Sequence, residues 1–488
     1  MFCAGVLRAL ALWGALGVAL LALSPAGALP AANAIPVETP DVLGFTEAGM
    51  VALPPMLELL GAKSETNAKT GAITVTRAGK SFAFTLAKTA ATANRKAVKL
   101  AMAPSKIGEV IYLPVHSLVE ALGGACTLKG DTMQVTLPGL ASPLALPFVK
   151  VLDYTEDTPT PLAIDDCRDC WNQLYVMNAD GSDARRLTYT FLGNALPAFS
   201  ADGSKWVITR PYIFLPFGHI VTRTAAGAQN AVLRQTDLVN ASVVYMQGAV
   251  SPDGSTVYYV EIKPLAEEVQ ICRMPFAGGT AEALVEGISP SLSPDGKTIA
   301  YTGSNGGEVA EFVMLMDADG KNPRALGKGS DPIFSPDGRA VAFYRTYAAE
   351  EEAPAVLATC LLGEGEPTIH EAPEAERAHA EETPVFTRDG KQIIFAREGQ
   401  GIFATSLDRK KTVRLTDDES DTCPVPAPDG KQIYFLRGND LYRMPFPGED
   451  TTPVPVIRDR SITRFTFSPD GKLIFFLVQP QPLFDLHN

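Results

Sequence analysis

The sequence predicts an all-β, seven-bladed β-propeller that is closed by N-terminal strands and preceded by a small α+β domain. Two observations support the propeller. A five-residue pattern that ends in Asp-Gly recurs seven times, and the aspartates of successive copies are 40 to 52 residues apart. A period near 40 residues with strand-like units is typical of a propeller, in which each blade packs against its neighbours. The copies are Phe199–Gly203, Val250–Gly254, Leu292–Gly296, Phe334–Gly338, Phe386–Gly390, Pro426–Gly430 and Phe467–Gly471.

Each copy predicts a tight hairpin turn. Pro fixes φ at the first central position, Asp bonds back to the backbone, and Gly supplies the positive φ that closes the turn. Apolar residues follow at the third and fifth positions after each Gly, as in Ile299 and Tyr301. They share one strand face, and the residue between them is often apolar too. This pattern indicates strands that are covered on both sides, as blade stacking requires.

A second hairpin signal alternates with the first and predicts the outer two strands of a blade. Its copies are Asn172–Leu187, Val269–Leu284, Glu311–Leu326, Gly401–Leu415 and Asp440–Val456. The last inner hairpin, Thr466–Leu477, has almost no chain after it, whereas Asn172–Leu187 precedes every inner hairpin. We therefore expect the N-terminal strands to complete the C-terminal blade within a propeller of residues 165–480, which removes an exposed sheet edge.

The Ser-Pro-Asp-Gly-Lys-x-Ile-x-Phe pieces, together with Leu-Tyr-Val-Met-Asn-Ala-Asp-Gly at 174–181, resemble the propeller repeats of the TolB family of bacterial envelope proteins. The resemblance implies a propeller fold. It says little about activity, because similar repeats occur in proteins of different function. Two features depart from TolB: the chain has seven repeats where TolB has six blades, and it lacks a TolB-type N-terminal domain.

Residues 35–138 lack the Asp-Gly repeat and show a different pattern, of short helices and strands. Leu-Pro opens a short amphipathic segment that stops at Gly in both Val51–Ala62 and Ile111–Gly124, as helix ends prefer. Short strands are expected after each helix, at 72–77 and 81–86 and again at 126–129 and 132–137. The region resembles the copper amine oxidase N-terminal-like domain, a small α+β module of exported proteins. The resemblance implies a stalk or attachment role without copper chemistry, and His116 alone makes no metal site.

The start of the chain has the pattern of a signal peptide. A single positive charge precedes the apolar run Ala9–Leu23, and small residues at 26–28 offer a cleavage site. We expect a leader over residues 1–28, with cleavage as late as residue 34 as an alternative. An uncleaved membrane anchor is the second alternative. The Pro-rich stretch over residues 139–164 is the expected linker between the two domains.

Composition limits the partners. The net charge of −13 and the pI near 5.0 argue against nucleic acid and leave no polybasic surface for anionic lipids. We expect a monomer that meets a membrane only through the leader or an uncleaved anchor. Cys167 and Cys170 are the candidate disulfide; two free thiols or a redox-active pair are the alternatives.

No residue pattern points to a catalytic, cofactor or metal site. A propeller peptidase needs a Gly-x-Ser-x-Gly elbow, which the sequence lacks. A metal-dependent propeller lyase needs clustered histidines, and those after residue 165 are scattered at His219, His370, His379 and His487. We therefore expect no catalytic residues, no cofactor and no metal.

Two repeats are about ten residues longer than the others, and such insertions fall in loops at one rim, where partners dock. The first insertion, Pro211–His219, is aromatic and supplies the candidate partner-binding residues Tyr212, Phe214, Phe217 and His219. The alternative is an extra strand or a loop packed on the neighbouring domain. The second insertion, Ala348–Pro384, is rich in Glu, Ala and Pro and is expected to be solvated.

These features predict an exported, non-catalytic protein of the cell envelope, periplasmic or extracellular. The propeller is expected to bind an envelope protein or a cell-wall glycan, and the N-terminal module to serve as a stalk. One alternative is a propeller hydrolase or lyase with an active site in the central channel. Another is a structural component of a surface layer or wall-associated assembly.

Overall fold

The structure is a computed structural model of the chain. It describes residues 29–38, 40, 42–44, 49–107, 110–130, 132–150, 172–190, 193–212, 217–224, 231–235, 243–263, 266–304, 311–345, 355–363, 368–371, 381–446, 452–458 and 460–479. The expected leader, both residues of the candidate disulfide and Phe214 lie outside these residues. Within them, no helix is both long and apolar enough to cross a membrane.

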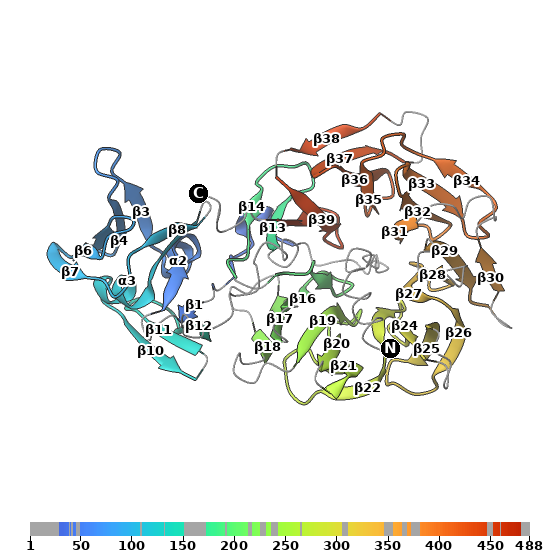
Figure 1. Cartoon of the computed structure of the whole chain (residues 1–488), viewed down its shortest axis with the longest axis horizontal. Coiled ribbons are helices and arrows are strands. Elements are labelled where there is room, and N and C mark those ends of the chain that lie inside the picture. Colours follow the sequence, from blue (N-terminus) through green and yellow to red (C-terminus); the bar gives the residue numbers. More distant parts are fainter. Residues whose placement is uncertain are drawn as a thin grey trace, which may run out of the picture.

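The first unit is built from two sheets and two helices, and Figure 1 draws it in blue and cyan. The seven-stranded sheet has the order β10-β11-β12-β1-β2-β9-β8, and the five-stranded sheet has the order β3-β4-β5-β6-β7. The elements are the 3-10 helix η1 (Ala32–Ala34), β1 (Val42–Gly44), β2 (Met50–Ala52), α2 (Leu53–Leu60), β3 (Lys63–Thr66), β4 (Ile73–Arg77), β5 (Lys80–Phe84), β6 (Ala90–Ala93), β7 (Lys96–Lys99), β8 (Ser105–Ile107), β9 (Val110–Pro114), α3 (Val115–Ala121), β10 (Ala125–Lys129), β11 (Thr132–Thr136) and β12 (Leu144–Lys150).

Both expected helices are present: α2 begins at Leu53 of its Leu-Pro pair, and α3 begins directly after Pro114, which is its N-cap. Pro occupies the first turn of α2, and Gly61 ends that helix with φ of +61°, a left-handed conformation that glycine adopts without steric cost. The apolar sides of both helices pack into one core, with Met56 and Leu118 fully buried among strand residues such as Phe82. The strands expected after each helix are also present, as β4, β5, β10 and β11.

The first half of the expected linker, residues 139–164, contains a strand of the first unit. Residues 144–150 form strand β12, which pairs antiparallel with β11 and parallel with β1. Its prolines suggested a linker, yet Leu146 is fully buried in the core of the first unit. Burial of that apolar face outweighs the cost of Pro147 in the strand. The rest of the expected linker, residues 151–164, lies outside the described part of the chain.

The chain from residue 172 onward forms seven four-stranded sheets. Their strands are β13 (Gln173–Asn178), β14 (Arg185–Arg186), β15 (Ala198–Phe199), β16 (Lys205–Tyr212), β17 (Phe217–Thr224), β18 (Ala231–Gln235), β19 (Val244–Val250), β20 (Thr256–Lys263), β21 (Glu268–Pro275), β22 (Glu282–Glu286), β23 (Ile288–Leu292), β24 (Thr298–Gly303), β25 (Phe312–Asp317), β26 (Arg324–Lys328), β27 (Ser330–Phe334), β28 (Ala340–Arg345), β29 (Val356–Leu361), β30 (Thr368–Glu371), β31 (Glu381–Phe386), β32 (Gln392–Arg397), β33 (Gly401–Ser406), β34 (Thr412–Arg414), β35 (Asp421–Pro426), β36 (Gln432–Arg437), β37 (Asp440–Pro445), β38 (Val454–Ile457), β39 (Ile462–Phe467) and β40 (Leu473–Val478).

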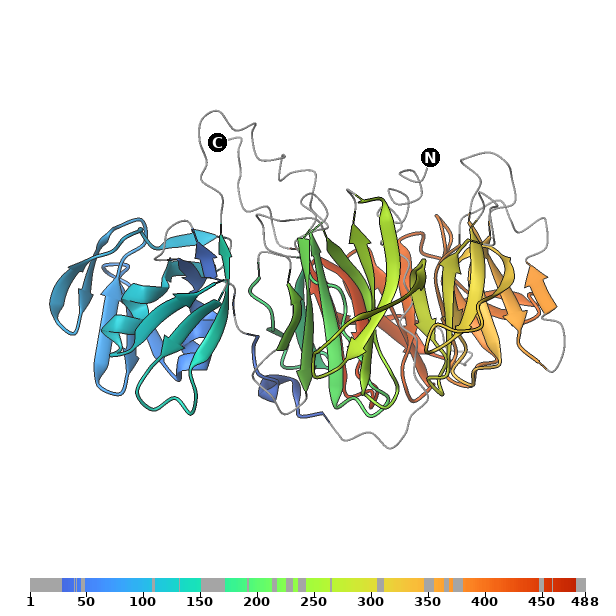
Figure 2. The ribbon, with the colours of Figure 1, turned by 90° about the horizontal axis from the view of Figure 1, so that it is seen from below.

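The sheets follow one another around a ring (Figure 1), and Figure 2 shows the ring beside the first unit. In six sheets four consecutive strands pair in chain order. The seventh has the order β14-β13-β40-β39, so strands from the two ends of this region share one sheet. Six residues of β13 pair antiparallel with β40, and Tyr175 stacks on Phe476 with ring centroids 5.4 Å apart.

The repeated Asp-Gly turns join the first and second strands of the sheets, as the sequence predicts. In the copy at 250–254, Ser251 donates a 2.5 Å hydrogen bond to Asp253, which also accepts the backbone N–H of Ser255 at 2.9 Å. Gly254 has φ of +69° and closes the turn. One carboxylate oxygen thus satisfies two donors, which explains why Asp recurs at this position.

The second insertion is not wholly solvated. Strands β29 and β30 lie within it, and Val356 and Leu357 are fully buried. Glu381 is also buried, with 1% of its surface exposed, because Arg397 and Arg409 both contact its carboxylate. The expectation was wrong for these residues, since acidic composition around a short apolar run concealed a blade strand and a buried ion pair.

Candidate functional site

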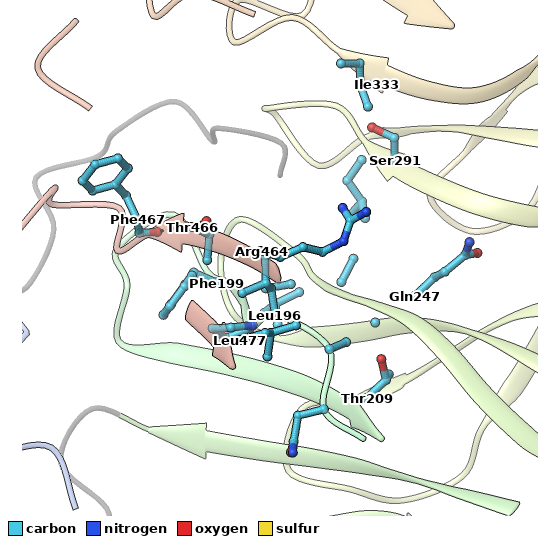
Figure 3. Close-up of a pocket in the computed structure, with 18 of the residues that line it drawn as sticks. Leu196, Phe199, Thr209, Gln247, Ser291, Ile333, Arg464, Thr466, Phe467 and Leu477 are labelled. Atoms are coloured by element: carbon cyan, nitrogen blue, oxygen red, sulfur yellow. Dashed lines mark hydrogen bonds between the residues drawn. The ribbon is translucent and has the colours of Figure 1, made fainter. Parts of the chain in front are cut away.

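A cavity of about 250 Å³ lies where the first strands of the sheets converge. Six of these strands supply lining residues: β15, β19, β23, β27, β35 and β39. Most of the lining is apolar, including Leu196, Phe199, Ile333 and Leu477 (Figure 3). Because residues from six sheets meet here, no local stretch of sequence encodes the cavity. We call it the central pocket.

A repeated irregularity shapes the strands around the central pocket. The pairing of the first strand to the second shifts register in β19, β23, β27, β31, β35 and β39. Five of these bulges contain a non-glycine residue with φ between +48° and +54°, a conformation that bulky residues rarely adopt. These residues are Gln247, Ser289, Asp331, Thr383 and Cys423.

Hydrogen bonds link three of the bulges across neighbouring sheets. The Gln247 side chain donates to the Ser289 hydroxyl at 3.3 Å and accepts the Ser289 backbone N–H at 2.6 Å. The Ser289 hydroxyl in turn donates to Asp331 at 2.6 Å. Because the two bonds of Gln247 join β19 to β23 and the Asp331 bond joins β23 to β27, this chain of contacts fixes the relative positions of the three strands. Gln247 also lines the central pocket.

Arg464 is the charged residue of the lining. It belongs to β39 and is partly buried, and Figure 3 shows its side chain extending between Leu196 and Ser291 toward Gln247. Within the described part of the chain, its guanidinium makes no ion pair. The neutral polar groups of Thr209, Gln247 and Ser291 also line the pocket. The central pocket therefore combines apolar walls with one positive charge.

The lining of the central pocket has few groups that titrate. None of the described residues that line it carries a carboxylate or an imidazole. Burial raises the pKa of the nearby Cys423 thiol, against a smaller lowering effect of Arg464. That thiol is therefore protonated at neutral pH and a poor nucleophile. The described residues also contain no group of three His, Cys, Asp or Glu side chains that could hold a metal ion.

Of the four candidate partner-binding residues, the structure describes the backbone of Tyr212 and Phe217 and the side chain of His219. Tyr212 and Phe217 are paired across the end of the β16–β17 hairpin. The first insertion therefore extends two strands, in line with the alternative that it forms extra strand. His219 is only 2% exposed. Burial, with a contribution from Arg210, lowers the pKa of His219 to about 3. The prediction that His219 meets a partner at the surface was wrong, because β17 carries it into a buried ionic cluster.

That cluster is a feature that sequence reasoning missed. Glu38 lies between Arg210 and Arg223, and each of the three side chains is at most 2% exposed. Arg223 also donates to the Pro36 carbonyl at 2.6 Å, and Arg210 donates to the Asn194 side chain at 3.0 Å. The partners of Glu38 follow it by more than 170 residues, so no local pattern indicated the cluster.

Residues 29–38, which we call the N-terminal strap, bring Glu38 to this place. Leu29, Ala32 and Ile35 are buried in a core shared with Trp206 and Phe475. The backbone N–H of Ala32 donates to Asn178 at 3.2 Å. Figure 2 shows the strap in blue against the green sheets, apart from the rest of the first unit. The strap thus packs as part of the ring, although the chain enters the first unit directly after it.

Among the described residues, Cys126, Cys272, Cys360 and Cys423 form no disulfide. Burial raises the pKa of the Cys126 thiol to about 12 and that of Cys360 to about 11. These thiols are therefore unreactive at neutral pH. The candidate disulfide between Cys167 and Cys170 stays a prediction.

Comparison with known proteins gives a family match for the first unit and several similar solved structures. Residues 33–137 match the family model described as the copper amine oxidase N-terminal domain. Similar solved structures include the putative TolB from Agrobacterium tumefaciens (17% identity, 63% of this chain and 98% of that chain, TM-score 0.38) and TolB from Acinetobacter baumannii (15% identity, 74% and 79%, TM-score 0.35). An oligogalacturonate lyase from Vibrio parahaemolyticus is also similar (11% identity, 59% and 89%, TM-score 0.43). No curated protein sequence matches the chain significantly.

Proposed function

We propose that this protein is an exported, non-catalytic binding module of the cell envelope, periplasmic or extracellular and monomeric. In this proposal the seven four-stranded sheets are the blades of a propeller, and the pairing of β13 with β40 closes it. The unit that matches the copper amine oxidase N-terminal domain is its stalk. The apolar N-terminal run Ala9–Leu23 supports export.

The central pocket is the observation that carries the binding function. Concave, mostly apolar sites with a few polar groups are the usual form of a ligand site. Here the polar groups of the described lining are one guanidinium, several hydroxyls and three amides. Hydrolysis or elimination commonly relies on a carboxylate or an imidazole as general acid or base, and neither is found among the described residues that line the pocket. We therefore favour binding of an envelope protein or a cell-wall glycan over the hydrolase or lyase alternative.

The binding function is tested with the purified exported protein as bait against solubilised envelope and purified cell wall. Leu196→Trp places a large side chain in the central pocket, and Val413→Trp on the exposed strand β34 is its control, since Val413 is 46% exposed. We expect one identified species to be captured by the wild type and by Val413→Trp but lost with Leu196→Trp. After separate purification, that species should bind the wild type and Val413→Trp but not Leu196→Trp.

Two outcomes count against the proposal. Capture of nothing by any variant argues against a binding module, and turnover of a wall glycan or peptide by the wild type argues for the enzyme alternative. The thermal unfolding midpoint of Leu196→Trp must match that of the control, because a misfolded variant loses capture trivially.

The hairpin end at Tyr212 and Phe217 is tested separately in the same assay. The triple variant Tyr212→Ala, Phe214→Ala and Phe217→Ala leaves the lining of the central pocket unchanged. If this variant loses capture and Leu196→Trp retains it, partners dock at the hairpin and not at the pocket.

A further inference from the structure

We propose that the central pocket binds a monoanionic ligand whose carboxylate pairs with Arg464 and whose apolar group fills the remaining space. This inference rests on the proposed binding function and specifies the chemistry of the ligand. A hydrophobic acid or the C-terminal residue of a peptide has this chemistry. Arg464 is a ligand-binding residue in this scheme and has no catalytic role.

The first argument is charge. Arg464 brings a planar, cationic guanidinium with several N–H donors to the wall of the pocket, and its side chain is partly buried. In the described part of the chain, this charge has no anionic partner, whereas the buried arginines 210, 223, 397 and 409 each contact a carboxylate. A partly buried charge gains most from an oppositely charged group that also accepts its hydrogen bonds. A carboxylate is such a group, because its two oxygens accept two parallel N–H bonds from one guanidinium.

The second argument is the number of charges. Arg464 is the sole cation of the lining among described residues, and Gln247, Ser291 and Thr209 add only neutral groups. Asp331 directly precedes the lining residue Pro332, and its carboxylate accepts the Ser289 hydroxyl. A dianionic group such as a phosphomonoester therefore finds one positive charge and a nearby negative one. A single carboxylate suits this arrangement better.

The third argument is the size and polarity of the remaining space. The cavity measures about 250 Å³, and an apolar cavity of roughly 150 Å³ is large enough to hold benzene. An apolar wall beside Arg464 is formed by Leu196, Phe199 and Leu477 (Figure 3). The pocket thus has room for one aromatic or branched aliphatic group next to the carboxylate. Burial of that group supplies affinity, and the guanidinium supplies selectivity for the acid.

The test uses two probes of nearly the same size, N-acetyl-L-phenylalanine and N-acetyl-L-phenylalanine amide, in which an anionic carboxylate is replaced by a neutral amide. Calorimetric titration of the full exported protein should show the acid binding about tenfold to hundredfold more tightly than the amide. Arg464→Gln should abolish this preference, and Arg464→Lys should retain part of it because lysine keeps the charge but not the paired geometry. Arg324→Gln, on the exposed side of strand β26, should behave as the wild type.

The inference is overturned if the acid and the amide bind equally, if Arg464→Gln keeps the preference, or if neither probe binds. Failure of the probes leaves the binding function standing when envelope capture is still lost with Leu196→Trp. If the probes do not bind and no envelope species is captured, both the binding function and the carboxylate inference are refuted. Equal thermal unfolding midpoints for the wild type and Arg464→Gln exclude misfolding as the cause of lost binding.

Discussion

At the scale of single residues, the molecule uses arginine in two ways. Glu38 and Glu381 are buried, and each is held by two arginines, whereas Arg464 lines a cavity without an ion-pair partner among the described residues. Buried ion pairs contribute little net stability, because desolvation offsets their attraction. Removing one partner is costly, since it leaves a charge unpaired in a dry environment. The buried clusters are therefore structural, and Arg464 is the residue with capacity for a ligand.

The first prediction concerns Glu381. Its carboxylate accepts hydrogen bonds from Arg397 and Arg409, and from the backbone N–H of Leu357 at 2.9 Å. Glu381→Gln leaves both guanidinium groups without a counter-charge and should lower the free energy of unfolding by about 3 kcal/mol or more. Glu282→Gln is the control, because Glu282 pairs with Arg273 but its side chain is 57% exposed. Its loss should stay below about 1 kcal/mol in urea unfolding. Equal losses of unfolding free energy in the two variants would refute the difference between the buried and the exposed ion pair.

The second prediction concerns the pH dependence of stability. The pKa of His219 is about 3 in the folded protein, because burial disfavours the charged imidazolium and Arg210 repels it. The unfolded chain has the ordinary pKa near 6.5 and binds a proton first. Stability from the neutral imidazole is thus complete above pH 6.5 and declines as the pH falls toward 3, by up to about 1.4 kcal/mol per pH unit.

His219→Gln should therefore flatten the decline in the free energy of unfolding between pH 7 and pH 5. The comparison is urea unfolding at several pH values, with His370→Gln on strand β30 as the control that retains the wild-type slope. A wild-type slope in His219→Gln would show that groups other than His219 dominate the acid response.

At the scale of elements, the repeated turn is the unit that the sequence specifies most completely. Six of the seven copies have Ser or Thr two residues before Asp, and in each its hydroxyl donates to that Asp. The copy at 426–430 has Ala427 there, so among the described residues Asp429 accepts one hydrogen bond, from the Lys431 backbone N–H at 2.9 Å. The turn still forms, with Gly430 at φ of +70°.

This difference gives the third prediction. Asp295→Ala removes two hydrogen bonds, from Ser293 at 2.7 Å and from the Lys297 N–H at 3.1 Å, and should cost about 1 to 2 kcal/mol. Asp429→Ala removes one and should cost about half as much. Urea unfolding midpoints of the two variants are the measurement. An equal or larger loss in Asp429→Ala would mean that the hydroxyl contributes nothing to the turn.

Sequence predicted those elements whose signal is local. The Asp-Gly hairpins and the two Leu-Pro helices were expected at their places because turn chemistry and capping act within a few residues. Strands β12 and β29 were missed, since Pro147 and the acidic neighbours of Val356 masked short apolar runs. The central pocket and the Glu38 cluster were missed for a different reason: their members come from distant positions, and only the assembled ring brings them together.

At the scale of the whole molecule, the N-terminal strap joins the two units at a second place. The first unit is continuous with the ring through residues 151–171, and it is also preceded by residues 29–38, which pack on the ring. Glu58 on α2 adds contacts between the units, because it accepts the Val37 N–H at 3.2 Å and pairs with Arg185 at 2.8 Å. The strap therefore limits how the first unit rotates relative to the ring.

The fourth prediction follows from the strap and concerns leader removal. Cleavage after Ala28 keeps Leu29 and Ala32, which are 5% and 0% exposed, whereas cleavage after Ala34 discards both. Burying one leucine side chain contributes about 2 kcal/mol, and the later cleavage also removes the Ala32 hydrogen bond to Asn178. We therefore expect the exported protein to begin at Leu29, as intact-mass and N-terminal sequence measurements would show.

Purified forms that start at Leu29 and at Ile35 test the energetic reason directly. The shorter form should unfold at lower urea concentration by an amount equivalent to about 2 kcal/mol, and a protease should cut it sooner between the first unit and the ring. A form starting at Leu29 that carries Leu29→Ala separates the side chain from the backbone contacts and should lose most of that stability. If the form starting at Ile35 is as stable as the longer one, the strap adds nothing to the fold, and either cleavage site is acceptable.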